Sequence, residues 1–154
     1  MTSAGTARDI VDASLYMTLA TADAAGRPWS SPVYFAHTEY RKFLWVSSPE
    51  ARHSHNIAVR PEVGIAVFDS SVAIGTGQGV YVSAVAAVVE GADAERAIDA
   101  FSRRSLSHGG RAWTLDDVRG DTGIRLYRAV ADNYSILAKD GRPDHRIPID
   151  LGHI

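Results

Sequence analysis

The sequence contains no cysteine and no apolar run long enough to cross a membrane. Without cysteine the protein cannot form disulfides, bind a metal through thiolates or use a cysteine nucleophile. The longest uncharged apolar run, residues 79–89, is interrupted by Ser83 and is shorter than the ~18 residues that a membrane-spanning helix needs. The beginning of the chain lacks the apolar segment of a secretory signal and carries Arg8 and Asp9, which predicts a cytoplasmic protein.

An excess of charge of one sign is also absent, because 16 Lys and Arg residues and 18 Asp and Glu residues leave a net charge of -2. This balance argues against a general nucleic-acid binder that depends on phosphate neutralisation. Lysine itself is rare: Lys42 and Lys139 are the only two, so 14 of the 16 basic residues are arginine. Arginine suits bidentate binding of phosphate and carboxylate, although GC-rich codons produce the same bias.

The composition, 45% hydrophobic and 22% charged, is that of one globular domain spanning residues 1–154. Ser48 as the capping residue and Pro49 at the first helical position predict a helix that ends before Pro61. In the rest of the first half, apolar spacing and turn residues predict a helix over residues 7–16 and strands over residues 16–21, 29–36 and 43–46.

The second half of the chain continues this pattern, with a predicted strand over residues 79–90 that is apolar on both faces. A short chain has little left to cover such a strand twice, so we expect a partner subunit to cover its outer face. The Gly-rich segment 75–79 precedes a strand rather than a helix, which predicts a hairpin connection and not a dinucleotide-binding loop. The remaining elements are strands over residues 63–68, 124–131 and 134–138, and helices that begin at Asp93 and Thr114.

These elements together predict an α+β, mainly β fold: an antiparallel β-barrel with two to three peripheral helices. One segment of this fold, residues 46–57, has the clearest chemical signal. A strand delivers the hydroxyls of Ser47 and Ser48 to a helix N-terminus, whose free N–H groups attract anions. The same segment then places two basic residues in that helix.

Arg52 and His53 are predicted to lie about one turn into this helix. A cation there opposes the helix dipole and costs up to about 1 kcal/mol. A phosphate bound at the helix N-terminus accounts for this placement. The alternative is that Glu50 offsets the charge of Arg52, whose side chain then points to solvent, and spacing alone leaves both interpretations open.

Four segments, residues 16–21, 26–35, 46–57 and 60–68, together resemble the pyridoxamine 5'-phosphate oxidase-like family, the FMN-binding split barrels. The resemblance extends from Tyr16 to about Glu90, and the order and spacing of its segments are more specific than any single motif. It implies a six-stranded antiparallel split β-barrel, a homodimer, and an FMN at each of two sites on the dimer interface.

The resemblance also implies which residues hold the cofactor. Backbone groups of a second-strand segment would meet the flavin ring, third-strand residues would lie beside the ring and the phosphate, and an arginine would bind the phosphate. A second basic position follows that arginine, and a polar side chain at the start of the long strand would contact the flavin. The matching positions are, in that order, Ser31, Pro32, Val33 and Tyr34; Val46 and Ser47; Arg52; His53; and Gln78.

The sequence departs from the family's oxidases at three places. His53 stands where those enzymes commonly carry lysine, and Ser31 stands where they carry arginine. Their C-terminal arginine and histidine motif has no match in residues 125–154. The resemblance therefore implies the fold and an FMN cofactor rather than vitamin B6 oxidation.

Other kinds of chemistry have weaker signals. His53 and His55 are about 200° apart on a helix and cannot converge on one metal ion, so no metal site is predicted. No Gly-x-Ser-x-Gly pattern of a serine hydrolase is present. The aromatic residues Trp113, Tyr127 and Tyr134 either stack on a ligand or pack in the core or an interface.

The leading hypothesis is a homodimer that binds FMN and performs flavin redox chemistry on a small organic substrate. We predict no catalytic side chain, because the flavin itself transfers the hydride or electrons. The alternatives are a deazaflavin-dependent reductase, a non-catalytic flavin- or haem-binding protein, and an empty dimeric barrel.

Overall fold

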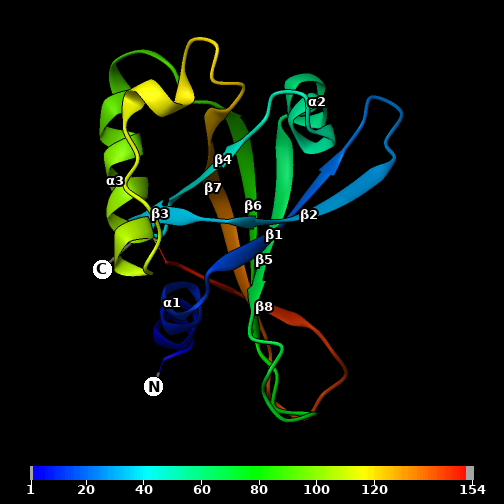
Figure 1. Cartoon of the computed structure of the whole chain (residues 1–154). Helices are drawn as coiled ribbons and strands as arrows, with labels where there is room; N and C mark the ends of the chain where they lie inside the picture. Colours follow the sequence, from blue (N-terminus) through cyan, green and yellow to red (C-terminus); the bar gives the residue numbers. More distant parts are fainter. Residues whose placement is uncertain (1, 152–154) are drawn as a thin grey trace.

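One antiparallel sheet forms the frame of the protein in the computed structural model, which describes residues 2–151 (Figure 1). Its eight strands within these residues are β1 (Tyr16–Ala22), β2 (Pro28–Tyr34), β3 (Ala36–Thr38), β4 (Lys42–Ser47), β5 (Glu62–Phe68), β6 (Gly79–Val88), β7 (Arg125–Leu137) and β8 (Arg146–Ile149). The helices are α1 (Ser3–Ala13), α2 (Arg52–Val59) and α3 (Ala94–Ser107), with short 3-10 turns η1 (Gly91–Asp93) and η2 (Leu115–Val118). No helix in the described part of the chain is both long and apolar enough to cross a membrane.

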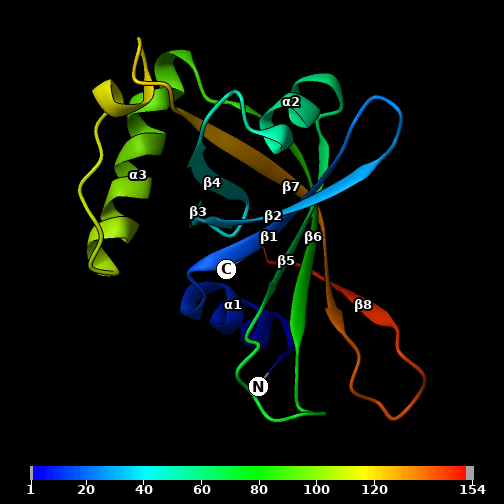
Figure 2. The same cartoon turned by 45° about the vertical axis from the view of Figure 1, so that its right-hand side comes forward.

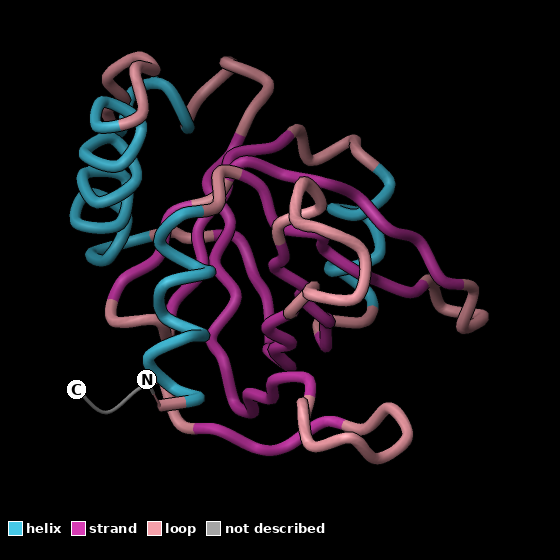
Figure 3. Tube along the Cα trace, turned by 90° about the horizontal axis from the view of Figure 1, so that it is seen from below, coloured by secondary structure: helices cyan, strands magenta, loops and turns pink. Residues whose placement is uncertain are grey.

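The strands follow one another across the sheet in the order β2-β1-β5-β6-β7-β4-β3, and β8 also pairs with β7. Every pairing between them is antiparallel. The sheet curls, so that β2 from one end of this order contacts β4 near the other end. Viewed from below, the strands wind around the core while α3 lies outside the curl (Figure 3). The predicted class, a mainly β split barrel, is confirmed; the described chain has eight strands rather than six.

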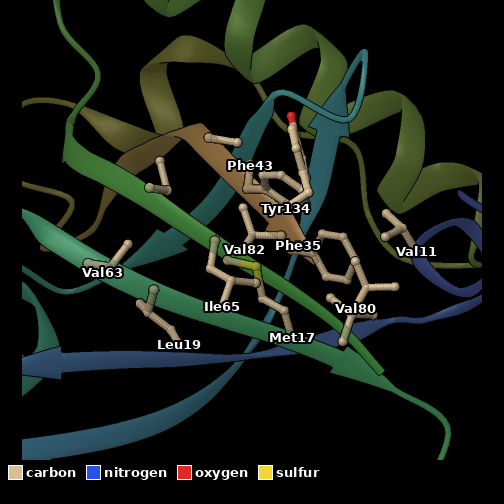
Figure 4. Packing of buried hydrophobic residues seen from close by; sticks show 14 of the residues in the cluster. Val11, Met17, Leu19, Phe35, Phe43, Val63, Ile65, Val80, Val82 and Tyr134 are labelled. Atoms are coloured by element: carbon tan, nitrogen blue, oxygen red, sulfur yellow. The ribbon is translucent and has the colours of Figure 1, made fainter. Parts of the chain in front are cut away.

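The concave face of the sheet holds the main hydrophobic core (Figure 4). Side chains alternate between the two faces of each strand, and in β6 the inward residues Val80, Val82, Ala84 and Ala86 are buried. The helices α1 and α2 lie at opposite ends of the curl (Figures 1 and 2). Each adds buried residues to this core, namely Ala7 and Val11 from α1 and Ile57 from α2.

The outer face of the sheet is only partly covered. The helix α3 packs over β3, β4 and the start of β7, where Leu44 and Leu126 contact the cluster that contains Ile98 and Phe101. Over β6 the outer face is open, and Val85 is 47% exposed. The long strand is thus apolar on its inner side and mostly apolar on its outer side, where Arg146 lies 3.6 Å from the centre of the Tyr81 ring and Val85 stays open within the described chain.

Several predicted boundaries were wrong for local reasons. Residues 124–131 and 134–138 belong to one strand, β7, because Asp132 forms a bulge: Ser83 pairs with Asn133 and Ala84 with Ala131. The predicted strand over residues 29–36 is divided into β2 and β3, and β8 lies where no strand was predicted.

The predicted helices differ mainly at their ends. Thr2 caps α1, its Oγ1 accepting a hydrogen bond from the N–H of Gly5 at 2.9 Å, so the helix begins and ends earlier than predicted. Helix α3 begins at Ala94 as expected, although the Asp93 side chain makes no capping hydrogen bond. The capping box at Thr114 is confirmed, with Asp117 as its second member, but it starts a 3-10 turn.

The side chain of Arg104 connects α3 to the end of α1. One guanidinium nitrogen, Nη2, donates to the carbonyl oxygens of Val11 at 3.1 Å, Asp12 at 3.3 Å and Ser14 at 3.0 Å. The guanidinium also lies 5.3 Å from the centre of the Phe35 ring. A cation bound to the last carbonyls of a helix is favoured by both hydrogen bonding and the helix dipole.

We therefore expect Arg104→Met to lower the free energy of unfolding by about 2 kcal/mol, since hydrogen bonds to a charged group are lost and the carbonyls lose a partner. Denaturant unfolding measures the change. Arg103→Met is the matched control, because Arg103 is exposed and pairs only with Asp99 at 3.5 Å, an interaction of little value. Equal effects of the two substitutions would contradict this role of Arg104.

Candidate functional site

The sheet is open between β2 and β4. Among the described strands, β2 pairs only with β1. Strand β4 pairs with β7 throughout, but with β3 only at residues 42–44, so residues 45–47 have no strand on the side away from β7. Because β2 and β4 contact each other without forming a ladder, their backbone edges are open to a ligand. We call this opening between β2 and residues 45–47 the split.

The predicted residues of β2 point to both faces of the sheet. Ser31 and Val33 lie opposite Leu19 and Met17, which are core residues, and thus face inward. Pro32 and Tyr34 face outward, and the Tyr34 ring makes an edge contact with that of Tyr16, with centroids 6.2 Å apart. Proline is tolerated here because β2 is an edge strand. The shared feature of residues 31–34 is therefore their open backbone edge.

Helix α2, at the end of the split, begins later than predicted. Ser48 forms a turn instead of a cap: its Oγ accepts from the N–H of Glu50 at 3.0 Å, and its carbonyl from the N–H of Ala51 at 3.1 Å. Such local hydrogen bonds compete with helix formation, which explains the delayed start. Arg52 and His53 are consequently the first two helical residues, rather than residues one turn inside.

The start of α2 lacks a side-chain cap. Its N-cap residue is Ala51, which makes no capping hydrogen bond through its side chain. The first N–H groups of a helix have no partner within the helix, and they attract an anion when no cap binds them. Arg52 adds a positive charge at the same place, so this terminus has the features of an anion-binding site.

The guanidinium of Arg52 is held over the ring of Trp29, with its carbon 4.4 Å from the ring centroid. Among residues 2–151, Arg52 has no carboxylate within ion-pair distance, and Glu50 instead pairs with His55 at 3.5 Å. Glu50 therefore does not pair with Arg52, although Arg52 is exposed to solvent, as that alternative predicted. Trp29 was not predicted as a site residue, although it is the one large aromatic side chain on β2's inward face.

Ser47 and His53 share a hydrogen bond across the end of the split, with Oγ and Nε2 2.7 Å apart. His53 is half-buried, and this burial lowers the pKa of its imidazole below the ordinary 6.5, which favours the neutral ring. Two of the predicted residues thus lie side by side, next to a third, Arg52. The hydroxyl and the imidazole add hydrogen-bonding groups to the positive helix terminus.

Polar contacts from one buried and one exposed side chain hold α2 in place. The side-chain amide of Asn56 donates to Thr21 Oγ1 at 3.0 Å, inside the protein. Arg60, just after the helix, donates to the carbonyls of Asp23 at 3.1 Å and Ala24 at 3.2 Å in the β1–β2 turn. The orientation of the helix terminus relative to the β1–β2 hairpin is therefore fixed.

Within one chain, Gln78 lies far from Ser47, Arg52 and His53. Its loop, between β5 and β6, lies at the opposite end of the sheet from α2 (Figures 1 and 2). Its amide donates to the carbonyl of Leu137 at 2.9 Å and accepts from the N–H groups of Leu137 at 3.0 Å and Gly79 at 2.8 Å. The two bonds to Leu137 connect the residue before β6 to the end of β7, which is a structural role.

The other polar and aromatic candidates contact side chains of the same chain. Tyr34 bonds through its hydroxyl to His108 Nδ1, 2.8 Å away at the end of α3, a contact that no sequence signal indicated. Tyr127 and Tyr134 are buried in the core, and Trp113 packs against Phe101. Within this chain, these three rings therefore serve packing. Among residues 2–151, no three His, Asp or Glu side chains lie close enough to hold a metal ion.

The lowered pKa of His53 predicts a pH dependence of stability. The unfolded imidazole binds a proton more tightly than the folded one, so the free energy of unfolding should fall as the pH drops through 6.5. His53→Gln keeps a hydrogen-bonding side chain that does not titrate. Between pH 7.5 and pH 5.5, an interval of about two units around the ordinary histidine pKa, we expect this variant to lose less stability than the wild type.

Denaturant unfolding across this pH range measures the difference. The control is His55→Gln, on the exposed face of the same helix. If the wild type and His53→Gln lost the same stability on acidification, burial would not govern the protonation of His53.

Comparison with known proteins agrees with this geometry. The sequence model of the family described as Pyridoxamine 5'-phosphate oxidase matches residues 4–132. No curated protein sequence matches the chain.

Several solved structures have the same fold. A heme binding protein from Mycobacterium smegmatis superposes with a TM-score of 0.71 at 22% identity, over 96% of this chain and 58% of that chain. The heme storage protein HutZ from Vibrio cholerae gives a TM-score of 0.63 at 26% identity, over 81% of this chain and 87% of that chain. A structure described as an F420 reductase gives 0.60 at 17% identity, over 84% and 95% respectively. The chain thus spans little more than half the length of the first of these proteins.

Proposed function

Because the chain belongs to the pyridoxamine 5'-phosphate oxidase family, we propose that it is a flavin-dependent redox protein that binds FMN at the split. The observation that carries this proposal is the uncapped N-terminus of α2, which presents Arg52 and His53 beside Ser47 at the end of two open strand edges. A ligand that fits this arrangement has a phosphate at one end and a flat ring with hydrogen-bonding groups at the other. FMN has both.

The phosphate is bound, in this proposal, by the first N–H groups of α2, the Arg52 guanidinium and the Ser47 hydroxyl. Charge-assisted hydrogen bonds from an arginine and from helix amides are the common means of binding a phosphate monoester. Contact with the Trp29 ring holds the Arg52 guanidinium in position before the ligand arrives. A neutral His53 contributes a hydrogen bond but no charge.

The ring lies along the split, where the backbone edges of residues 31–34 and 45–47 can exchange hydrogen bonds with its polar rim. Bound flavin supplies hydride or electron transfer. The chain's own residues bind it, orient it and shape access to it, and no side chain is assigned as an acid or base.

Titration of FMN with the purified protein should perturb the flavin absorption spectrum. Removing the charge-assisted bonds of Arg52 should weaken FMN binding about 10-fold or more in Arg52→Ala, because such bonds contribute about 1.5–3 kcal/mol. Riboflavin, which lacks the phosphate, should bind the wild type and Arg52→Ala equally. Arg103→Ala, an exposed arginine on α3, is the control for loss of charge.

A flavin spectrum identical to that of free FMN at saturating protein would refute the proposed cofactor. Equal losses of FMN and riboflavin affinity would instead place Arg52 away from the phosphate.

Two other ligands have support from the comparisons. A structural neighbour is described as an F420 reductase, which favours a deazaflavin coenzyme, and two neighbours are described as heme binding or heme storage proteins. Parallel titrations with FMN, coenzyme F420 and haemin distinguish the three, since only the preferred ligand should bind at low concentration. The rate at which an acceptor reoxidises the reduced flavin then separates two possibilities. An enzyme should speed this reaction relative to free flavin, and a non-catalytic binding protein should not.

We also propose that two copies of the chain associate through the open outer face of β1, β5 and β6. Small side chains, including Ala20, Gly64 and Ala66, line a shallow groove of about 250 Å³ on this face, and Val85 is exposed beside it. This face carries small residues and Val85 among polar groups such as Asn133 and Arg146, and a second copy bound there covers the side of β6 that the chain itself leaves open.

Sedimentation should show a wild-type dimer. Val85→Arg should shift it toward the monomer, because a charge would be buried in the interface. Leu106→Arg is the control: Leu106 is 55% exposed on α3, away from this face. A monomeric wild type, or a Val85→Arg protein with unchanged mass, would contradict the proposed interface.

A further inference from the structure

A small cavity with positively charged walls lies on the outer side of the sheet, beneath the first turn of α3. Its volume is about 50 Å³. Strands β3, β4 and β7 contribute Thr38, Lys42, Leu44 and Arg128, while Asp93, Arg96 and Ala97 come from the start of α3. Lys42 and Ser47 are the first and last residues of β4, so this cavity and the split are at opposite ends of that strand.

The strand register explains why these side chains converge. Thr38 is directly opposite Lys42 in the β3–β4 pair, and Leu44 is directly opposite Arg128 in the β4–β7 pair. Lys42 and Leu44 are two residues apart in β4, so all four side chains point to the same face. Arg96 is three residues after Asp93 and therefore lies on the same side of α3.

The charges around the cavity do not balance. Arg128 is largely buried, with its side chain 25% exposed, and its carboxylate partner is Asp93 at 3.6 Å. Within residues 2–151, Lys42 and Arg96 have neither a hydrogen bond nor an ion pair through their side chains. Three cations thus face one carboxylate. Lys42 and Arg96 are exposed and Arg128 is partly exposed, so solvent weakens the repulsion between these like charges without removing it, and a bound anion relieves it.

The size of the cavity limits the ligand. A volume of about 50 Å³ exceeds the roughly 10–15 Å³ that a cavity needs to hold one water molecule, and it admits a small oxyanion. A flavin ring or a haem is too large. We propose that Lys42, Arg96 and Arg128 form a site for a phosphoryl group, either inorganic phosphate or the terminal phosphate of a small metabolite. We call it the α3 anion site.

The binding groups suit this ligand. Arginine offers pairs of N–H donors that match two phosphate oxygens, and lysine adds a compact charge. The hydroxyl of Thr38, which makes no side-chain hydrogen bond among the described residues, is a further donor at the wall of the cavity. The α3 anion site does not depend on the proposed flavin site, since the two share no residue.

Thermal unfolding in phosphate and in chloride of the same ionic strength tests the proposal, because a ligand that binds the native state raises Tm with its concentration. Phosphate should raise the Tm of the wild type more than chloride does. Lys42→Met/Arg96→Met should bind phosphate at least about tenfold more weakly, since two charge-assisted interactions are lost. Arg128 is left intact because it is largely buried and paired. The control Arg103→Met/Lys139→Met removes the same charge elsewhere and should respond like the wild type.

Arg52→Ala separates this site from the flavin phosphate site, and it should keep the phosphate response whether or not FMN binds the wild type. Glycerol phosphate tests the source of the ligand: a response to it indicates the end of a metabolite, and a response to inorganic phosphate alone indicates the free ion. The proposal is overturned if neither compound raises Tm beyond chloride, if the response is unchanged in Lys42→Met/Arg96→Met, or if it is lost in Arg52→Ala. The Tm of each variant in chloride shows that it folds.

Discussion

The curl of the sheet, which brings β2 beside β4 without pairing them, is the constraint on which the candidate site depends. Strand β4 is bonded to β7 along its length, while β3 reaches only its first residues, and β2 is bonded to β1 alone. If β2 and β4 paired, the barrel would close and their backbone groups would be used in a ladder. An unpaired edge exposes backbone groups that are free to pair, so the open edge beside a positive helix terminus is the basis of the proposed binding site.

The start of α2 shows the same conflict between local stability and function. An alanine at the N-cap costs about 1 kcal/mol relative to serine or aspartate, and placing Arg52 at the positive end of the helix adds to that cost. A buried contact from Asn56 to Thr21 and exposed contacts from Arg60 to the β1–β2 turn hold the helix in place nevertheless. A local rule broken on a firmly held element is typical of a binding site.

Much of the fold was predictable because its signals are local. The β1–β2 hairpin, the α3 helix and the capping box at Thr114 depend on residues that are neighbours in the chain, and all three are observed. The same holds for the candidate site, since Ser47, Arg52 and His53 lie within one short segment and the hydroxyl, the cation and the helix start were visible in it. Their exact register was missed because the turn at Ser48 competes with the helix.

The sequence by itself thus determined the mainly β class, the family and the segment that forms the candidate site. Only the tertiary structure decided which groups meet. In it, Trp29 contacts Arg52, Gln78 bonds to Leu137 at the end of β7, and Lys42 and Arg128 line one cavity. These contacts join residues far apart in the chain, and they follow from strand register and sheet curl, which depend on the packing of the whole core rather than on any local pattern.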